Sequence, residues 1–213
     1  MNQASRQKIA GGYDQAAAGY DAAHETLGRK YQRIEASTRA LLKHGDVLDL
    51  GCGTGRLMRQ VSGGQSVGID ISLKMLKQMP RHMARAQADG HRLPFASECF
   101  DAVVAAQGVI RYMDLTSAMT EVFRVLRPGG RFATHQFGSV FSLRRLRRIA
   151  GELDLHQPED LTKPALAAGF TTIEVELWRP IRAYPYAVRV PSWLPGRLWT
   201  HCIARFEKPA IAT

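Results

Sequence analysis

Val47-Leu48-Asp49-Leu50-Gly51-Cys52-Gly53-Thr54-Gly55 decides the fold, because it joins a buried-strand pattern to a loop rich in glycine. Val47 to Leu50 is a short apolar run with one acid, which is the length of a strand buried on both faces of a parallel sheet. The glycines of the loop can turn the backbone sharply and let a ligand approach it closely. Arg56 to Val61 follows with helical spacing, so we expect the loop to lie at a helix N-terminus, where free N–H groups face outward.

The spacing of the glycines separates two classes of cofactor. A dinucleotide-binding loop has the pattern G-x-G-x-x-G, whose third glycine would fall at Arg56 in this chain. The third glycine is instead Gly55, and with Asp49 the stretch reads D-x-G-x-G-x-G. This pattern resembles the signature loop of class I S-adenosylmethionine-dependent methyltransferases. A nicotinamide-dependent oxidoreductase is the alternative enzyme class, and the spacing disfavours it.

A second acid follows the next expected strand, Ser66 to Asp70, and Asp70 lies nineteen residues after Gly51. A carboxylate at this place in a nucleotide-binding α/β sheet can accept hydrogen bonds from both hydroxyls of a ribose. Ser72 is suited to cap the helix that comes next. Asp70 therefore predicts a ribose site, with Ile71 beside it, and the alternative is an acid that only caps a helix.

The resemblance continues over the third and fourth strands. Asp89-Gly90 is followed by Leu93-Pro94-Phe95 and by a buried-strand pattern from Phe100 to Ala105, as in this family. The resemblance implies that Asp89 accepts a hydrogen bond from the adenine amino group, with Gly90 alongside it; an ordinary loop acid is the alternative. Gln107 comes just after the strand, at the edge where α/β sheets place their ligands.

Strand and helix patterns alternate along most of the chain, which predicts an α/β fold with one doubly wound, Rossmann-like sheet. By resemblance, this sheet has seven strands, mostly parallel with an antiparallel last strand, and helices on both faces. The later expected elements are a helix at Asp114 to Leu126, a strand at Phe132 to Phe137, a helix at Pro158 to Ala168, a strand at Thr171 to Trp178 and the last strand at Trp199 to Phe206.

Residues 1–213 are expected to form a single domain, in which 1–43 cap the cofactor, 46–137 form the cofactor-binding core and 138–213 complete the sheet. Tyr13-Asp14 recurs seven residues later as Tyr20-Asp21, a spacing of two helical turns. The repeat resembles a segment that lies over the cofactor in small-molecule methyltransferases; the alternative is a helix that merely packs. Residues 27–43 predict a second cap helix, and the proline-rich insertion 179–198 predicts a wall of the acceptor pocket.

Composition indicates a cytoplasmic protein. Cys52, Cys99 and Cys202 are too few and too scattered for a disulfide framework. No signal-peptide pattern follows the N-terminus, and no uncharged apolar run approaches the roughly 20 residues of a membrane span.

Arginine is concentrated in the C-terminal half of a chain whose formal net charge is +10. Seven arginines and no acid lie between Glu121 and Glu152, and five more between Glu176 and Glu207. These stretches leave open peripheral membrane contact through 141–149 or 179–198 and a merely solvated basic surface. No nucleic acid partner is expected, and an RNA-binding protein or RNA methyltransferase is the alternative function.

The expected chemistry follows from the cofactor that the resemblance implies, S-adenosyl-L-methionine. Its sulfonium methyl is already electrophilic, so the protein needs mainly to position a small, apolar or amphipathic acceptor; no metal site is expected. His135, near the end of the fifth strand, is the candidate general base for an acceptor that must lose a proton. The expected cofactor-binding residues are Tyr20, Asp49, Gly51, Cys52, Gly53, Gly55, Asp70, Ile71, Asp89, Gly90 and Gln107.

Overall fold

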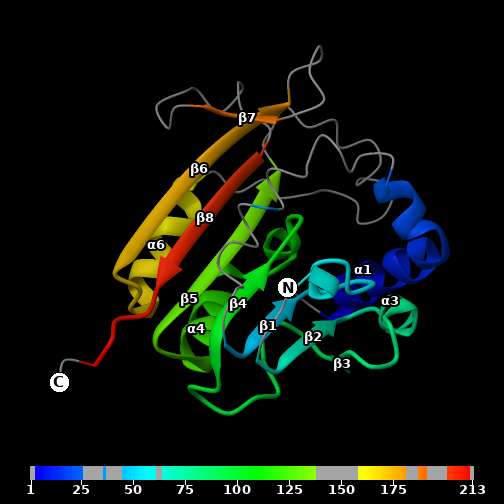
Figure 1. Ribbon diagram of the computed structural model, residues 1–213, viewed down its shortest axis with the longest axis horizontal. Coiled ribbons are helices and arrows are strands. Elements are labelled where there is room, and N and C mark those ends of the chain that lie inside the picture. Colours follow the sequence, from blue (N-terminus) through cyan, green and yellow to red (C-terminus); the bar gives the residue numbers. More distant parts are fainter. Residues whose placement is uncertain are drawn as a thin grey trace.

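A computed structural model of the chain describes residues 3–25, 36, 45–60, 64–137, 158–180, 187–190 and 201–211. Its centre is an eight-stranded sheet in the order β3-β2-β1-β4-β5-β8-β6-β7 (Figure 1). The strands are β1 (Val47–Leu50), β2 (Ser66–Asp70), β3 (Ala84–Gln87), β4 (Phe100–Ala105), β5 (Leu126–Phe137), β6 (Thr172–Pro180), β7 (Ala187–Val190) and β8 (His201–Glu207).

β1 lies in the parallel half of the sheet, between β2 and β4. Val47 is opposite Ser66 on one side and Ala102 on the other, so the three strands run in step. All four residues of β1 are buried, as the sequence predicts for a strand covered on both faces. This register brings the carboxyl ends of β1, β2 and β4 to one edge of the sheet.

The other half of the sheet confirms the antiparallel last strand and adds one strand to the seven expected. β8 pairs antiparallel with both β5 and β6, and β7 pairs antiparallel with β6 at the edge. β7 lies inside the insertion 179–198, where no strand is expected from the sequence. β5 begins at Leu126 rather than at Phe132, and its pairing with β4 shifts register between Phe100 and Ala102.

The helices are α1 (Gln3–Ala16), α3 (Leu73–Gln78), α4 (Leu115–Val125) and α6 (Pro158–Ala168), with short 3-10 turns η1 (Ala17–Gly19), η2 (Met58–Gln60) and η3 (Val109–Tyr112). α6 has the bounds that the sequence predicts. Ser72 and Asp114 cap the N-termini of α3 and α4 by accepting hydrogen bonds from the backbone N–H groups of Met75 and Ser117. Among these described helices, none is both long and apolar enough to span a membrane.

The main core fills the space between the sheet and two helices. α4 and α6 lie behind β4, β5, β6 and β8 in Figure 1. Their buried side chains pack on the same face of the sheet as Leu48, Leu50 and Phe132. Phe132 stacks on Phe206 with ring centroids 5.7 Å apart. The apolar periodicity of α4 thus reflects a helix that covers the sheet on one side.

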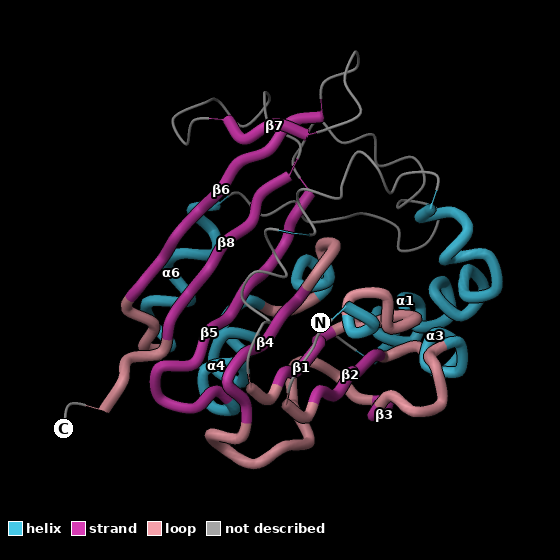
Figure 2. The backbone as a smooth tube through the Cα atoms, viewed as in Figure 1, coloured by secondary structure: helices cyan, strands magenta, loops and turns pink. Residues whose placement is uncertain are grey.

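One expected helix is much shorter in the structure. Within the described residues after the glycine loop, only Met58–Gln60 forms a helical turn, of the 3-10 type. The next residues of the sequence, Ser62-Gly63-Gly64, favour turns, and so leave little length for an α-helix. The described residues after the loop thus form a single 3-10 turn, and the longer helices coloured cyan in Figure 2 are α1, α4 and α6. The expected helix at 27–43 lies outside the described residues apart from residue 36. The arginine-rich stretch 141–149, for which the sequence leaves membrane contact open, and most of the insertion 179–198 also lie outside them.

Lys208 holds the end of α4 against the C-terminal segment. Its Nζ atom donates hydrogen bonds to the carbonyl oxygens of Leu126 (2.7 Å) and Phe123 (3.2 Å) and to a carboxylate oxygen of Glu98 (3.2 Å). The side chain is 10% exposed. A buried cation thus satisfies carbonyl groups that a helix C-terminus leaves without partners.

We predict that Lys208→Met lowers the free energy of unfolding by about 2 to 3 kcal/mol, because hydrogen bonds to a charged group are lost and buried carbonyls lose their donor. Denaturant unfolding measures the change. Lys77→Met, at an exposed position of α3, is the matched control and should change stability by less than about 0.5 kcal/mol. Equal effects of the two substitutions would contradict the role given to Lys208.

Candidate functional site

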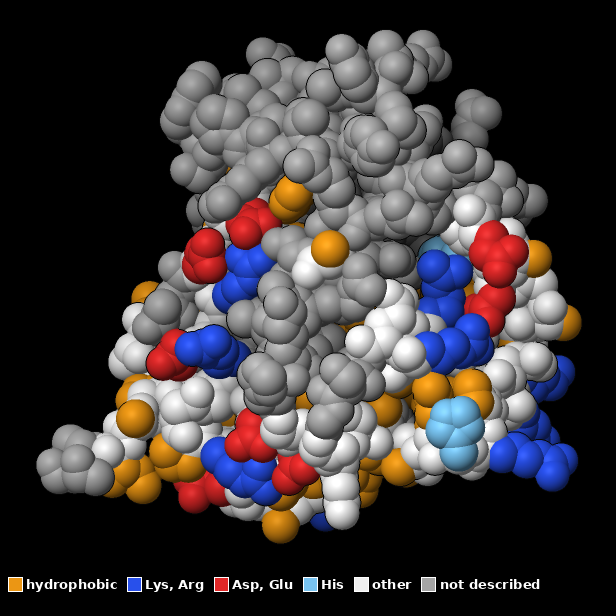
Figure 3. Space-filling view, viewed as in Figure 1, with side chains coloured by type: hydrophobic (Ala, Val, Ile, Leu, Met, Phe, Trp, Pro, Cys, Tyr) orange, Lys and Arg blue, Asp and Glu red, His pale blue; other side chains and the backbone are white. Residues whose placement is uncertain are grey.

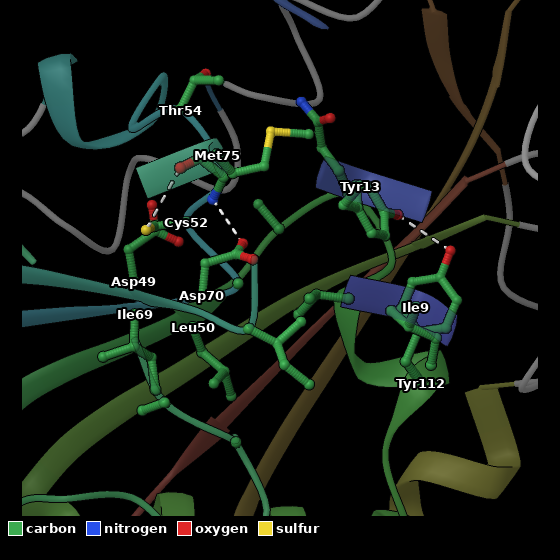
Figure 4. A pocket seen from close by; sticks show the side chains of 18 of the residues that line it. Ile9, Tyr13, Asp49, Leu50, Cys52, Thr54, Ile69, Asp70, Met75 and Tyr112 are labelled. Atoms are coloured by element: carbon green, nitrogen blue, oxygen red, sulfur yellow. Dashed lines mark hydrogen bonds between the residues drawn. The ribbon is translucent and has the colours of Figure 1, made fainter. Parts of the chain in front are cut away.

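A cavity opens at the edge of the sheet where β1, β2, β3 and β4 end, and its empty volume is about 970 Å³ including the space at its mouth. The lining comes from these strand ends and from α1, α3 and η3 (Figure 4). Parallel strands bring their carboxyl-terminal loops together, so the fold itself gathers residues that are far apart in the sequence.

The glycine loop forms one wall of this cavity. Gly51 and Gly53 have φ angles of +73° and +55°, which residues with a side chain rarely adopt. The backbone N–H groups of Gly51 and Cys52 donate to the carbonyl of Ile69, and Gly53 N–H donates to Asp70 Oδ2 at 2.9 Å. These hydrogen bonds attach the glycine loop to the end of β2 and fix its backbone conformation.

Asp49 is the acid that the sequence places just before the loop. Its side chain is only 2% exposed although it lines the cavity. Burial, with a smaller effect from the nearby charge of Asp70, raises its pKa to about 7. Because the Asp49 carboxyl is buried, its ionised form can bind a cationic group strongly.

Asp70 ends β2 and is oriented by backbone donors. The N–H groups of Gly53 and Ser72 donate to its two carboxylate oxygens at 2.9 and 2.8 Å. Burial raises the pKa of Asp70, and these hydrogen bonds oppose that rise. The carboxylate thus lies fixed at the floor of the cavity beside the glycine loop (Figure 4).

Asp89 follows β3 and has partners on both carboxylate oxygens. Oδ1 accepts from the backbone N–H of His91 and lies 2.6 Å from His91 Nδ1, while Oδ2 lies 2.8 Å from the guanidinium of Arg6. Burial raises the pKa of Asp89, but the bonds from His91 and the charge of Arg6 outweigh it, and the net pKa is lowered. His91 Nε2 accepts the Asp114 N–H, which places the ring proton on Nδ1, toward Asp89.

The loop after β4 has a strained residue in the cavity wall. Gln107 has a φ angle of +55°, which is uncommon for a residue with a side chain. Gly108 N–H then donates to the His135 carbonyl at 2.6 Å, which ties this loop to β5. Strained backbone of this kind is concentrated at functional sites, in agreement with the position of Gln107 in the lining.

The N-terminal segment covers the cavity and contacts the loops around it. The carboxylate of Asp14 accepts from the Ser72 hydroxyl and the Lys74 N–H, and that of Asp21 accepts from the Thr54 hydroxyl. Tyr13 and Tyr20 line the cavity, with ring centroids 6.4 Å apart. The repeated Tyr-Asp pairs thus place tyrosines in the cavity and aspartates on its rim.

Ten of the expected cofactor-binding residues line the cavity. They are Tyr20, Asp49, Gly51, Cys52, Gly53, Asp70, Ile71, Asp89, Gly90 and Gln107. Gly55 is not in the lining; its φ angle of +77° is one that residues with a side chain rarely adopt, and a Cβ atom there would also lie 3.1 Å from Met79. The binding roles of these residues stay predictions.

Several lining residues are missing from the sequence-based site, among them Ile9, Met75 and Met113. Tyr112 belongs to the run 107–112 after the fourth strand, whose residues the sequence predicts to face the methyl donor and acceptor, and Tyr13 belongs to the Tyr-Asp repeat. No local motif marks Ile9 or Met75. A signal that could have pointed to Met113 is its place next to the run 107–112.

His135 lies outside the cavity lining, on β5, and is 5% exposed. Burial, and to a lesser extent the charge of Arg111, lowers its pKa to about 3. The ring is therefore neutral near pH 7 and has little affinity for a proton. Its role as general base stays a prediction, and this environment makes it a weak base.

Four arginines of the two acid-free stretches, those whose side chains the structure describes, have carboxylate partners. Arg124 pairs with Glu121, Arg127 with Asp46 and Asp101, Arg131 with Glu207, and Arg205 with Glu174 and Glu176. Figure 3 shows blue and red side chains side by side over much of the visible face. In this part of the chain, the excess of arginine in the sequence does not form an open basic surface.

The remaining reactive side chains suggest no second chemistry. The three cysteines are free thiols, and burial raises the pKa of the Cys52 thiol, which keeps it protonated. The described ranges contain no cluster of three or more His, Cys, Asp or Glu side chains that could hold a metal ion.

Comparison with known proteins agrees with this geometry. Residues 48–134 match a family described as "Methyltransferase domain". The chain is 30% identical to the demethylmenaquinone methyltransferase of Paenarthrobacter aurescens over 94% of its own length and 83% of that protein. It is also 30% identical to the malonyl-[acyl-carrier protein] O-methyltransferase of Enterobacter lignolyticus, over 88% of its own length and 76% of that protein. Two other demethylmenaquinone methyltransferases are matched over only 61 and 65% of their length.

Among solved structures, a SAM-dependent methyltransferase from Thermotoga maritima superposes with a TM-score of 0.77. The match covers 94% of this chain and 99% of that one, at 18% sequence identity. At this identity the likeness concerns the fold, and it supports the Rossmann-like sheet described above.

We predict that Asp49→Asn makes the protein more stable than the wild type at high pH. The folded-state pKa of about 7 lies above the ordinary 3.8, so the wild type loses stability as pH rises between these values. The Asn variant lacks this loss and should gain up to about 4 kcal/mol relative to the wild type between pH 4 and pH 8. Denaturant unfolding at several pH values measures the difference. Parallel stability curves would contradict the burial cost assigned to Asp49.

A second prediction concerns His135. Because its pKa is about 3, its ring should stay neutral between pH 8 and pH 5. The carbon-bound ring protons can be followed by NMR and assigned by their absence in His135→Gln. A resonance that titrates with a midpoint near 6.5 would contradict the buried environment and would make His135 a competent general base.

Proposed function

Because this chain belongs to the class I S-adenosylmethionine-dependent methyltransferases of the small-molecule type, we propose that it transfers a methyl group to a small, apolar or amphipathic acceptor. The observation that carries the proposal is the set of carboxylates from three successive strand ends, Asp49, Asp70 and Asp89, in the wall of one cavity. The three acids differ in burial, so each suits a different hydrogen-bond donor or cationic group of a ligand.

The residues present fit the family's cofactor. An ionised Asp49 suits a cationic ammonium group, Asp70 suits the two hydroxyls of a ribose, and Asp89 suits the amino group of adenine. Gly53 leaves an open strip beside them, since a Cβ atom there would have Tyr20 Cε1 at 3.9 Å as its only neighbour within 4 Å. A larger residue in place of Gly53 would reduce the open space beside the three acids.

S-adenosylmethionine supplies a methyl group on a sulfonium that is electrophilic without further activation. The protein has to hold the acceptor in line with that methyl group and keep water away. Good positioning can supply roughly 7–11 kcal/mol of the barrier, so no covalent intermediate with the enzyme is needed. α1 and the tyrosines Tyr13 and Tyr20 cover the cavity and would exclude water from it.

The relatives are named for a quinone precursor and for a malonyl group on a carrier protein. The apolar part of the lining, with Ile9, Val109 and Met113, suits the hydrocarbon part of such an acceptor. For an acceptor that must lose a proton, such as a hydroxyl or a carbon acid, His135 stays the candidate base, although its low pKa makes it a weak one.

Titration calorimetry with S-adenosylmethionine and, separately, NADH tests the proposal. We predict binding of S-adenosylmethionine that tightens as pH rises from 5.5 to 7, by up to about tenfold per pH unit, because a cation binds the ionised form of Asp49. The measurement should stop near pH 7.5, where the amino group of the ligand begins to lose its own proton.

The variant Asp49→Asn should weaken this binding and flatten its pH dependence. Asp160→Asn is the matched control, because this acid is exposed on α6, away from the cavity lining. Tighter binding of NADH than of S-adenosylmethionine, or no binding of the latter, would overturn the proposed function.

A further inference from the structure

We propose that the hydroxyl groups of Tyr13 and Tyr112 form a subsite that binds an anionic oxygen of the methyl acceptor, with the positive charge of Arg111 behind the Tyr112 ring. The acceptor would then carry a carboxylate, or an ionised enol or phenol, on an apolar body. This inference rests on the proposed function and names the chemical class of the acceptor.

The two hydroxyls come from different elements and meet in the cavity. Tyr13 is on α1, Tyr112 ends η3, and their oxygen atoms are 3.1 Å apart. Both residues line the cavity, and in Figure 4 they lie on the opposite side of the view from Asp49 and Cys52. The three acids occupy the strand ends, so this wall is left for the second substrate.

A pair of hydroxyls in contact can donate to a ligand. The pair has two O–H protons, and the hydrogen bond between its members uses one of them. The other proton can be donated into the cavity, and both can turn toward a strong acceptor. Burial raises the pKa of Tyr13 well above its usual range, so this hydroxyl keeps its proton and can act as a donor at neutral pH.

Arg111 places a buried positive charge next to Tyr112, although it does not line the cavity itself. The residue is 5% exposed, and its guanidinium carbon lies 5.0 Å from the centroid of the Tyr112 ring. Its charge also acts on Tyr13, where it opposes the effect of burial on the pKa. A charge held away from water acts more strongly than an exposed one, so an anion at the hydroxyl pair would be favoured.

Apolar side chains flank the pair. Ile9 lies one helical turn before Tyr13 on α1 and, like Tyr112, lines the cavity. Val109 and Met113, on either side of Tyr112 in the sequence, also line the cavity and pack against the main core. A ligand that reaches the hydroxyls with one oxygen would place its hydrocarbon part against these residues.

The same tyrosines could be read as an aromatic cage for an amine, and Arg111 argues against that reading. Cages for ammonium groups use the faces of aromatic rings. The rings of Tyr13 and Tyr112 are edge to face, at 83°, and Arg111 already lies over the Tyr112 ring. A second cation at this wall would be repelled by the first, whereas an anionic oxygen would be attracted.

An acceptor of this class also fits the weak basicity of His135. A carboxylate is already ionised near pH 7, so its oxygen can attack the methyl group without first losing a proton to a base. The carbon–sulfur bond breaks as the new bond forms, its electron pair stays on sulfur, and the products are S-adenosylhomocysteine and a methyl ester.

Calorimetry with simple probes tests the subsite. The protein saturated with S-adenosylhomocysteine is titrated with octanoate, octylamine and 1-octanol, which share one chain and differ in the head group. We expect octanoate to bind at least about tenfold more tightly than the other two. Tighter binding of octylamine, or equal binding of all three, would overturn the inference.

Variants separate the subsite from a structural contact between α1 and η3. Tyr13→Phe and Tyr112→Phe should each weaken octanoate binding about threefold to tenfold while 1-octanol and S-adenosylhomocysteine keep their affinities within twofold. Arg111→Gln should weaken octanoate binding more than tenfold, and Arg111→Lys less. Equal losses for octanoate, 1-octanol and S-adenosylhomocysteine would show that the tyrosines only hold α1 in place, which would overturn the inference.

Failure of the proposed function gives a different result. A protein that binds neither S-adenosylmethionine nor S-adenosylhomocysteine would contradict the methyltransferase proposal. The preference for octanoate and its loss in the tyrosine variants could still be measured without either ligand, and these results alone decide whether the subsite exists.

Discussion

The parallel pairing of β1 with β2 on one side and β4 on the other is the constraint on which the site depends. Because Asp49 is opposite Gly68 and Val104, the ends of these strands fall at one level. Asp49, Asp70 and Gln107 then come within two residues of a strand end, and β3 adds Asp89 in the same way. A shift of one residue in this register would turn Asp49 to the other face of the sheet, into the core beneath α4.

Local chemistry explains which parts of the structure could be predicted from the sequence. Some features depend only on residues close together in the chain, and in these the structure agrees with the sequence-based prediction. They are the glycine loop, the serine cap of α3 and the bounds of α6. The pairing of Tyr13 with Tyr112 joins residues 99 positions apart, and Arg6 meets Asp89 across a similar separation. No local motif specifies such contacts, because they depend on how α1 lies on the finished sheet.

Two predicted elements have other bounds in the structure, and some arginines of the basic stretches have partners that the sequence pattern does not show. The sequence predicts a helix over 56–61, but among its described residues only Met58–Gln60 forms a helical turn. β5 begins earlier than predicted because Leu126 already pairs with Phe100 of β4, whereas β8 pairs with β5 only from Arg131 onward. The arginine-rich stretches looked like open basic surfaces in the sequence, but each described arginine of these stretches whose side chain is placed meets a carboxylate from another part of the chain or from the preceding helical turn. Charge counted along a sequence therefore says little about charge on a folded surface.

Few side chains of α1 are buried, although the helix covers the cavity. All residues of α1 are described, and of these Ile9 alone is fully buried. The segment is attached mainly by polar contacts at the rim, such as Arg6 with Asp89 and Asp21 with Arg59, whose side chains are 25 to 39% exposed. Exposed ion pairs contribute about 0.2–1 kcal/mol each, so these two contacts add little to the free energy that holds the segment over the cavity. The cavity itself is formed by the strand ends and their loops, so its lining there depends on the sheet rather than on these two contacts.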